Sequence, residues 1–315
     1  MKHKNARSGA APLGAMIMGL AVVALAGCAK QEPATPTTAP VAKPAAPTSD
    51  QLSGATVTGV FGAPVTLTAG LYEGPSAEAG AASRPTLKLW DSTIEFVDVD
   101  GAPPEEGIAL LTSSEGGSGT FSHLGVFGMQ DGKATTLGVV PLGDRVQLFR
   151  LWHEPGKVLL DIVEPGPGDP SCCPTQLSRK AFGWKDGKLQ QLSSEAVGGL
   201  SINLLAATDW MLVEMDGQPL PAGVVPPTTL IQYGKAAGFS GCNRYTGPIT
   251  ESVPGNVKLG ELAVTRKACD AAANDIEAAF LDRMRAATSY RFQAGRLLLV
   301  APQGDKPPRT LLFSR

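Results

Sequence analysis

The sequence predicts a mostly β protein with two small antiparallel β units and one packed helix, which lies in the second unit. Gly and Pro are abundant, at 37 and 26 of 315 residues, and they bound many short runs of strand-forming residues. Charged residues make up only 18% of the chain, which suits a turn-rich exported protein. A single stretch, about residues 274–287, repeats apolar residues at helical spacing.

Residues 1–27 are predicted to be an export leader and not a folded element. Basic residues precede an apolar run that is short for a transmembrane span of about 20 residues. The basic residues are Lys2, Lys4 and Arg7. The Leu-Ala-Gly-Cys ending at 25–28 resembles the lipobox of bacterial lipoproteins, which implies cleavage before Cys28 and acylation of its thiol and new amino group. An ordinary signal peptide or a single membrane anchor is the alternative.

Residues 28–50 are predicted to tether the folded chain to the lipid. After Cys28 they are mostly Ala, Pro and Thr, without the large apolar residues that offset the cost of ordering. In a polyproline-like form, at about 3.1 Å per residue, they reach up to roughly 70 Å. Ala29, and not Asp, follows Cys28, a pattern that in proteobacterial lipoproteins implies sorting to the outer membrane. We therefore expect a lipid-anchored envelope protein that faces the periplasm.

The net charge limits the classes of binding partner, and the number of cysteines indicates the cellular compartment. The formal net charge is −2, and removal of the leader takes away only basic residues, which argues against nucleic acid and anionic headgroups as partners. Besides Cys28 the chain has four cysteines, an even set that outside the cytoplasm indicates disulfides. These are Cys172, Cys173, Cys242 and Cys269.

From residue 204 to 315, short strand patterns surround the single helix. The expected strands are 210–215, 229–233, 236–240, 245–250, 290–292, 296–301 and 310–313. The helix has one apolar stripe, which should lie against a sheet, and charged residues at its other positions. The stripe consists of Ile276, Phe280, Met284 and Ala287.

Several motifs of this second unit occur together. They are Trp210, Gly-Phe-Ser-Gly-Cys-Asn-Arg-Tyr-Thr-Gly at 238–247, Leu-Ala-Val-Thr-Arg-Lys-Ala-Cys at 262–269, Phe280-Leu281 and Leu297-Leu298-Leu299. This set resembles the META domain of the heat-shock protein HslJ and related envelope proteins. The resemblance departs at Lys267, where Met is common. It implies a curved or barrel-like antiparallel sheet with one helix packed across it.

Cys242 followed by an amide residue has two interpretations. A nucleophilic thiolate needs a base, yet residues 203–315 contain no histidine. We expect instead a disulfide between Cys242 and Cys269, with a reactive thiol as the alternative. Asn243, Arg244 and Thr265 flank it and are the candidate ligand contacts, although Asn243 most often serves a turn.

Residues 51–192 predict the first of the two all-β units, joined to the second by a linker at 193–203. The expected strands are 56–60, 86–89, 93–99, 107–111, 124–129, 136–140, 146–152, 158–163 and 181–184. Three blocks stand out, at 116–121, 142–145 and 168–175, and together they resemble lipoproteins of the LppP/LprE kind. The first block is Gly-rich, but it lacks the Gly-Lys-Ser/Thr ending of a phosphate loop.

Asp98 and Asp100 form a weak calcium candidate beside the first block. A calcium loop needs carboxylates at alternate positions and a closing acidic ligand. Asp98 and Asp100 hold such places, with Glu105 and Glu106 as fillers. A solvated β-turn is the default expectation.

Cys172 and Cys173 are adjacent and leave several pairings open. A bond between them requires a strained peptide, which the prolines at 170 and 174 would help to hold. The alternatives are bonds to Cys242 and Cys269, or a soft-metal site completed by His123 and His153. We favour local pairing, because it needs no order between the units.

These observations favour a non-catalytic protein without a cofactor. The sequence contains no HExxH, GxSxG or CxxC motif. The META resemblance implies a role in heat-shock response and novobiocin tolerance, so we expect envelope integrity or stress tolerance through binding to an unknown envelope protein or small ligand. The alternatives are a small-ligand or soft-metal module, and a thiol redox partner that uses Cys172-Cys173.

Overall fold

β-Strands make up most of the computed structural model, which describes residues 45–76, 83–170 and 172–315. Cys28, the leader and most of the expected tether lie outside the described residues. The helices are α1 (Ser49–Ser53) and α2 (Ala271–Ala286), with 3-10 turns η1 (Asp91–Thr93) and η2 (Ile202–Leu205). Neither described α-helix has the length and apolarity needed to span a membrane. The prediction of a mostly β fold with one substantial helix in the second unit is confirmed.

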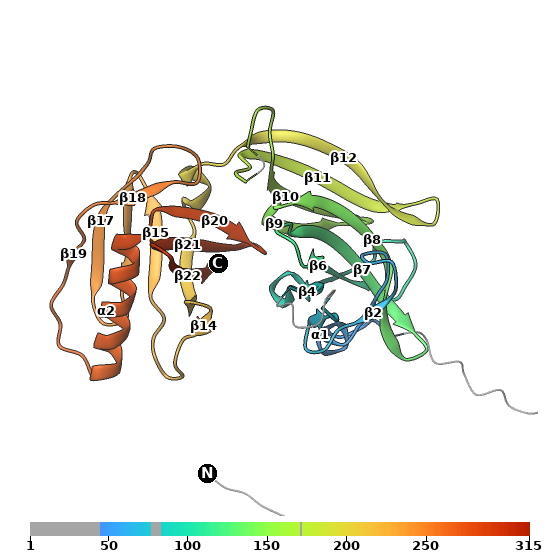
Figure 1. Cartoon of the computed structure of the whole chain (residues 1–315), viewed down its shortest axis with the longest axis horizontal. Helices are drawn as coiled ribbons and strands as arrows, with labels where there is room; N and C mark the ends of the chain where they lie inside the picture. The colour runs from blue at the N-terminus through green and yellow to red at the C-terminus, as the bar shows by residue number, and fades with distance from the viewer. Residues whose placement is uncertain (1–44, 77–82, 171) are drawn as a thin grey trace, which may run out of the picture. The chain divides into compact units, whose positions relative to one another are not determined.

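The first β unit contains two sheets. Its strands are β1 (Thr56–Val57), β2 (Val65–Thr66), β3 (Leu71–Glu73), β4 (Thr86–Leu89), β5 (Glu95–Val97), β6 (Glu106–Ser114), β7 (Phe121–Gln130), β8 (Lys133–Asp144), β9 (Gln147–Glu154), β10 (Lys157–Glu164), β11 (Gln176–Lys185) and β12 (Lys188–Gly199). The larger sheet has the order β2-β1-β8-β7-β6-β4-β3, with β5 also on β6, and the smaller has the order β12-β11-β10-β9 (Figure 1). Strands β6 to β12 are consecutive antiparallel neighbours except at the step from β8 to β9, where the chain changes sheets.

A corner between β8 and β9 lets the two sheets share an apolar core. Gly143 and Arg145 have φ values of 132° and 52° there, a backbone region that glycine tolerates and arginine rarely adopts. Leu124 of the larger sheet, and Leu160 and Phe182 of the smaller one, belong to the same buried cluster. Side chains therefore fill the space between the sheets.

The second β unit is a ten-stranded sheet that nearly closes into a barrel. Its strands are β13 (Asp209–Met215), β14 (Gln218–Pro219), β15 (Thr228–Gln232), β16 (Lys235–Phe239), β17 (Arg244–Glu251), β18 (Val257–Leu259), β19 (Ala263–Val264), β20 (Ser289–Gln293), β21 (Arg296–Gln303) and β22 (Lys306–Ser314). The order is β18-β17-β16-β15-β13-β22-β21-β20, with β14 on β13 and β19 on β17. Its ends meet where the Val257 N–H donates to the Thr288 carbonyl (3.0 Å) and the Tyr290 N–H donates to the Gly255 carbonyl (2.8 Å).

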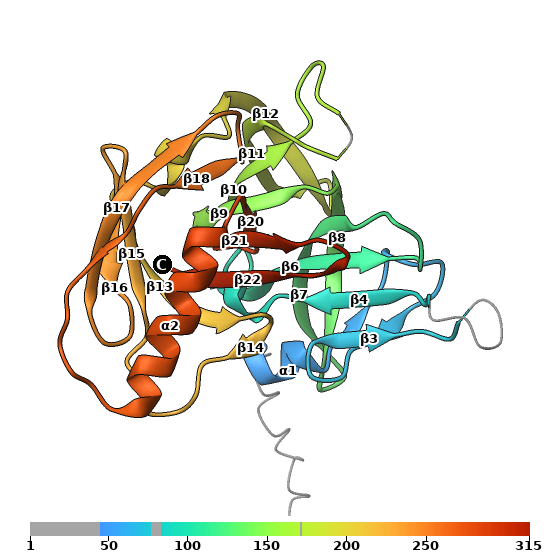
Figure 2. The same cartoon turned by 60° about the vertical axis from the view of Figure 1, so that its left-hand side comes forward.

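Helix α2 lies across β21 and β22 (Figure 2). Its stripe is buried as predicted, and Phe280 contacts Tyr245 and Phe313 edge-on in the core. The helix begins at residue 271 and not at 274, because Asp270 is its N-cap and its Oδ1 accepts the Ala273 N–H (2.8 Å). Periodicity alone does not reveal such a cap.

Two expected segment boundaries differ from the structure. Residues 49 and 50, placed at the end of the tether, belong to α1 (Ser49–Ser53), because the Thr48 capping box starts a turn that buries Leu52. Residues 193–199, placed in the linker, continue β12, whose partner β11 extends back to Gln176.

The two β units also touch directly: the Phe149 and Phe292 rings lie 4.7 Å apart between centroids.

Candidate functional site

The Cys242–Cys269 disulfide joins the motif at 238–247 to the segment that precedes α2. The Cα atoms of the two cysteines lie 5.9 Å apart, and Cys242 is buried. The second disulfide joins Cys172 to Cys173. Both bonds are consistent with the local pairing that we favoured. A disulfide has no thiolate, so this state offers neither a nucleophile nor a soft-metal ligand at these positions.

Asn243 is almost completely buried, and every polar atom of its side chain is hydrogen-bonded. Its Oδ1 accepts the Lys267 N–H (2.6 Å) and the Thr265 hydroxyl (2.9 Å). Its Nδ2 donates to Glu277 Oε1 (3.0 Å) and approaches Cys242 Sγ (3.2 Å). Asn243 thus links two distant loops to α2. Within the described residues, its bonding capacity is satisfied without a ligand.

Glu277 is the residue that sequence reasoning missed, because we assigned it to the polar face of α2. Its Oε2 accepts the Asn243 N–H (2.8 Å) and the Ser240 hydroxyl. Burial alone would raise the pKa of Glu277, but hydrogen bonds from Ser240 and Asn243 outweigh it and hold the pKa below its usual value. We call Ser240, Cys242, Asn243, Thr265 and Glu277 the Asn243 cluster. The cluster holds the motif at 238–247, residues 265–267 and α2 together, and we call this structural role a clamp.

Arg244 and Thr265 border a shallow hollow on the outer surface. The Arg244 N–H donates to Thr265 Oγ1 (3.1 Å), and the Arg244 side chain is exposed. The hollow has a volume of about 420 Å³ and is lined mainly by apolar atoms of β16, β17 and β19. Of the three candidate ligand contacts, only these two line it, while Asn243 lies within the clamp.

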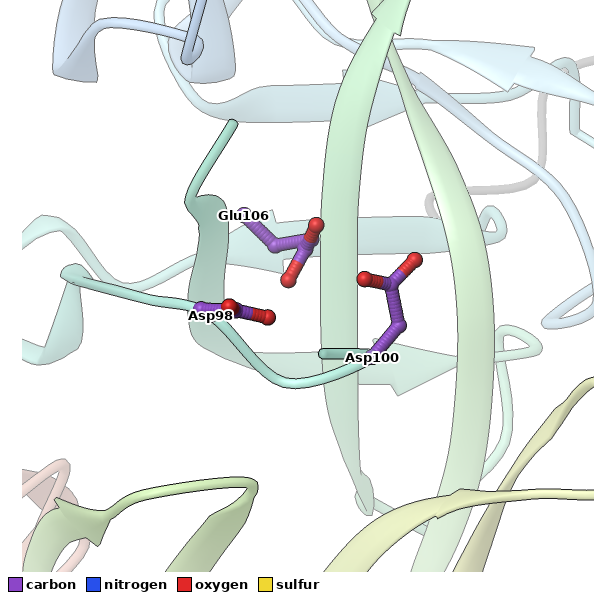
Figure 3. Close-up of side chains that lie close together, drawn as sticks. All are labelled: Asp98, Asp100 and Glu106. Atoms are coloured by element: carbon purple, nitrogen blue, oxygen red, sulfur yellow. The ribbon is translucent and has the colours of Figure 1, made fainter. Parts of the chain in front are cut away.

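The calcium candidate gathers into a compact group of three carboxylates (Figure 3). Oxygens of Asp98, Asp100 and Glu106 lie within 4.8 Å of one another. Each also accepts a backbone N–H: Gly101 on Asp98 (2.7 Å), Ala102 on Asp100 (2.8 Å) and Val99 on Glu106 (2.7 Å). Burial raises the pKa of Glu106, and the charges of Asp100 and Asp98 add to this. The loop's own backbone accounts for the arrangement, in line with a turn.

A polar pair in the first unit is also buried. Ser113 Oγ and His123 Nε2, on the paired strands β6 and β7, lie 2.9 Å apart. Burial lowers the pKa of His123, so its neutral form is favoured. His153, the other histidine considered as a metal ligand, is exposed on β9.

The three blocks of the first unit converge on one cleft of about 420 Å³. They supply the loops β6–β7, β8–β9 and β10–β11. Since neighbouring antiparallel strands run up and down, alternate turns fall at the same end of the sheets. Thr120, Arg145 and Cys172 with Pro174 line the cleft from these loops. Arg291 to Ala294, at the end of β20 and in the turn to β21, also line the cleft. We call this the three-loop cleft.

Hydrogen bonds lock the three loops in place. The Arg145 N–H donates to the Thr120 carbonyl (2.8 Å), and the Thr120 N–H donates to Asp144 Oδ1 (3.0 Å). In the third loop, Asp169 Oδ2 accepts the N–H groups of Gly166 (2.8 Å) and Thr175 (2.7 Å), which lowers the pKa of Asp169. The sequence singled out these blocks, but it did not indicate that they meet or that Arg291 and Trp90 join them.

Comparison with known proteins assigns the second unit. The family model of the META domain matches residues 203–311. No curated protein matches the sequence. Among solved structures, an NMR structure of a protein from Burkholderia xenovorans is 29% identical, covers 40% of this chain and 97% of its own, with a TM-score of 0.31.

Proposed function

We propose that this chain is a non-catalytic, lipid-anchored envelope protein that acts by binding and supports envelope integrity under stress. The observation that carries this proposal is the convergence of three separate sequence blocks on the three-loop cleft. Preformed clefts of this size with a few polar groups are typical of binding sites. The Asn243 cluster, in contrast, contains the most distinctive motif and is engaged in holding α2.

The lipid anchor is the part of the proposal that rests on the leader. The Leu-Ala-Gly-Cys ending at 25–28 and the Ala/Pro/Thr stretch after it support an acylated Cys28. Ala29 supports the periplasmic face of the outer membrane as the location. The META domain, which resembles that of HslJ, supports a stress-related role.

Membrane fractionation with a Cys28→Ser variant tests the anchor. We expect the unsubstituted chain in the outer-membrane fraction, with a mass that includes acyl chains, and the variant as an unacylated precursor or a soluble form. An unacylated native protein recovered from the cytosol would contradict the proposal.

Deletion of the protein should increase sensitivity to heat, novobiocin or detergent. Unchanged sensitivity to all three would remove the stress role.

A small-ligand function is the second candidate, and one observation favours its location. Apolar side chains fill the interiors of both β units, so an apolar ligand inside the META barrel lacks support. The three-loop cleft is the better place. A soft-metal site is disfavoured, because the four described cysteines are paired. The thiol redox alternative requires that Cys172–Cys173 be readily reduced, which a redox titration against glutathione measures.

A further inference from the structure

The three-loop cleft has an unbalanced charge. Its lining includes the guanidinium groups of Arg145 and Arg291 and no carboxylate, in a chain whose formal net charge is −2. Arg145 is paired, since its Nη1 lies 2.6 Å from Asp144 Oδ2 and its Nη2 donates to the Ser118 carbonyl (3.0 Å). Arg291 is exposed and makes no side-chain hydrogen bond or ion pair with the described residues. The uncompensated charge of the cleft is therefore that of Arg291.

Polar groups beside Arg291 are also uncommitted. The Thr120 hydroxyl and the Gln293 amide line the cleft, and neither side chain is hydrogen-bonded within the described part of the chain. In contrast, the Gln147 amide oxygen accepts the Phe292 N–H (2.9 Å), and the Ser122 hydroxyl donates to the Val146 carbonyl (3.3 Å). The free groups are thus donors from both β units, while neighbouring polar side chains are hydrogen-bonded.

The apolar residues of the lining are largely buried and fixed in place. Trp90 is nearly buried, its indole N–H donates to Thr112 Oγ1 (3.0 Å), and Lys88 Nζ lies 3.9 Å from the ring centroid. Phe292 packs on Phe149, so its ring position is also set. Cys172 adds one edge of the Cys172–Cys173 disulfide to the wall. Such a site can hold a small apolar body without rearrangement.

We propose that the three-loop cleft binds a small organic anion, a carboxylate on an apolar body of metabolite size. The carboxylate pairs with the Arg291 guanidinium, which has the planar, forked donor geometry that this anion matches. The Thr120 hydroxyl and the Gln293 amide supply further donors. The apolar body lies against Trp90 and the exposed Cys172–Cys173 disulfide. This inference deepens the proposed function by naming a ligand class for its cleft.

Three probes of matched shape or charge test this assignment by NMR on the full-length chain. They are 4-phenylbutyrate, its neutral amide 4-phenylbutanamide, and inorganic phosphate. We expect saturable shifts of the Thr120, Arg145 and Phe292 amide signals with 4-phenylbutyrate. The other two probes should bind at least about tenfold more weakly, since a charge-assisted pair contributes roughly 1.4 kcal/mol or more. Tight phosphate binding would instead assign the cleft to inorganic anions and overturn the proposal.

Substitution of the cation is the second arm. Arg291→Gln should weaken 4-phenylbutyrate about tenfold, while Arg266→Gln, an exposed arginine outside the cleft, should leave it unchanged. Equal affinity in R291Q, or no shift of the cleft signals at 20 mM probe (about twenty times a millimolar Kd), overturns the proposal. The acid-versus-amide comparison needs no variant, so it decides the question even if R291Q does not fold. None of these results bears on Cys28 acylation, so failure here is separable from failure of the anchor.

Discussion

The Asn243 cluster and the three-loop cleft contain similar kinds of residues and differ in what those residues contact. Asn243 is buried and Glu277 is half-buried, and they are hydrogen-bonded to each other and to two loops. In the cleft, Arg291, Thr120 and Gln293 line open space without side-chain partners among the described residues. The more distinctive motif thus stabilises the fold, and the less distinctive loops form the proposed binding site. The two regions differ in whether their hydrogen-bond donors already have partners, and not in how distinctive their sequence motifs are.

The largest effect that would sharpen this comparison comes from Gly238 in the META motif. A Cβ atom there would lie 2.1 Å from the Thr228 carbonyl oxygen, which is backbone and cannot move aside. We expect Gly238→Ala to lower the free energy of unfolding by at least about 3 kcal/mol, measured by urea denaturation. Gly198→Ala on β12 is the matched control, since nothing lies within 4 Å of its added atom. Equal stability of the two variants would show that the motif glycine is not structural.

Removal of the Cys242–Cys269 disulfide should have the next largest effect. The Cys242→Ser/Cys269→Ser variant frees a loop with a sequence separation of 27, and chain entropy assigns such a closure about 3 kcal/mol. Denaturation with and without reductant measures this. Reductant should lower the stability of the unsubstituted chain more than that of the variant, which retains only the Cys172–Cys173 bond. A variant as stable as the parent would contradict a clamping role.

Glu277→Ala tests the clamp from the helix side. It removes the carboxylate that accepts from two donors of Asn243 and from the Ser240 hydroxyl, which keeps only the Asn243 carbonyl as an acceptor, and we expect a loss of about 2 kcal/mol in unfolding free energy. Asp275→Asn, on the exposed face of the same helix, should change stability by less than about 0.5 kcal/mol. If E277A weakened 4-phenylbutyrate binding without loss of stability, the division between clamp and cleft would be wrong.

The smallest predicted effect is a pH dependence from His123 in the first unit. Burial holds the folded pKa of His123 below the unfolded value of 6.5, so the unfolded chain binds more protons between these two values. Stability should therefore fall as pH drops below 6.5, by at most about 1.4 kcal/mol per pH unit. The pKa of Glu106 is raised, so its effect on folding stability has the opposite sign: its stabilising contribution is lost as pH rises.

A comparison of two histidine variants isolates the contribution of His123 to the pH dependence of stability. His123→Gln should flatten the change of urea midpoint between pH 7 and 5, whereas His153→Gln, at an exposed position, should not. An unchanged slope in H123Q would show that His123 titrates normally in the folded chain.

Much of the fold follows from the sequence, because strands and the helix leave local patterns. The apolar stripe of α2 and the Gly- and Pro-bounded strands are such patterns, and the structure contains them with shifted ends. Contacts over long sequence separations leave no local pattern. Glu277 looks solvent-exposed by periodicity, and only the fold brings it to Asn243, 34 residues away. The same holds for Arg291, which reaches the cleft from another unit.

The two ends of the META sheet are hydrogen-bonded to each other, which affects how the sheet can interact with other chains. An open sheet presents rows of unpaired N–H and C=O groups that can recruit strands from other chains. Here Val257 and Tyr290 donate across the gap to Thr288 and Gly255, so the described ends of this sheet engage each other. Many copies of the proposed lipid-anchored chain on one membrane would then have little tendency to extend this sheet from molecule to molecule.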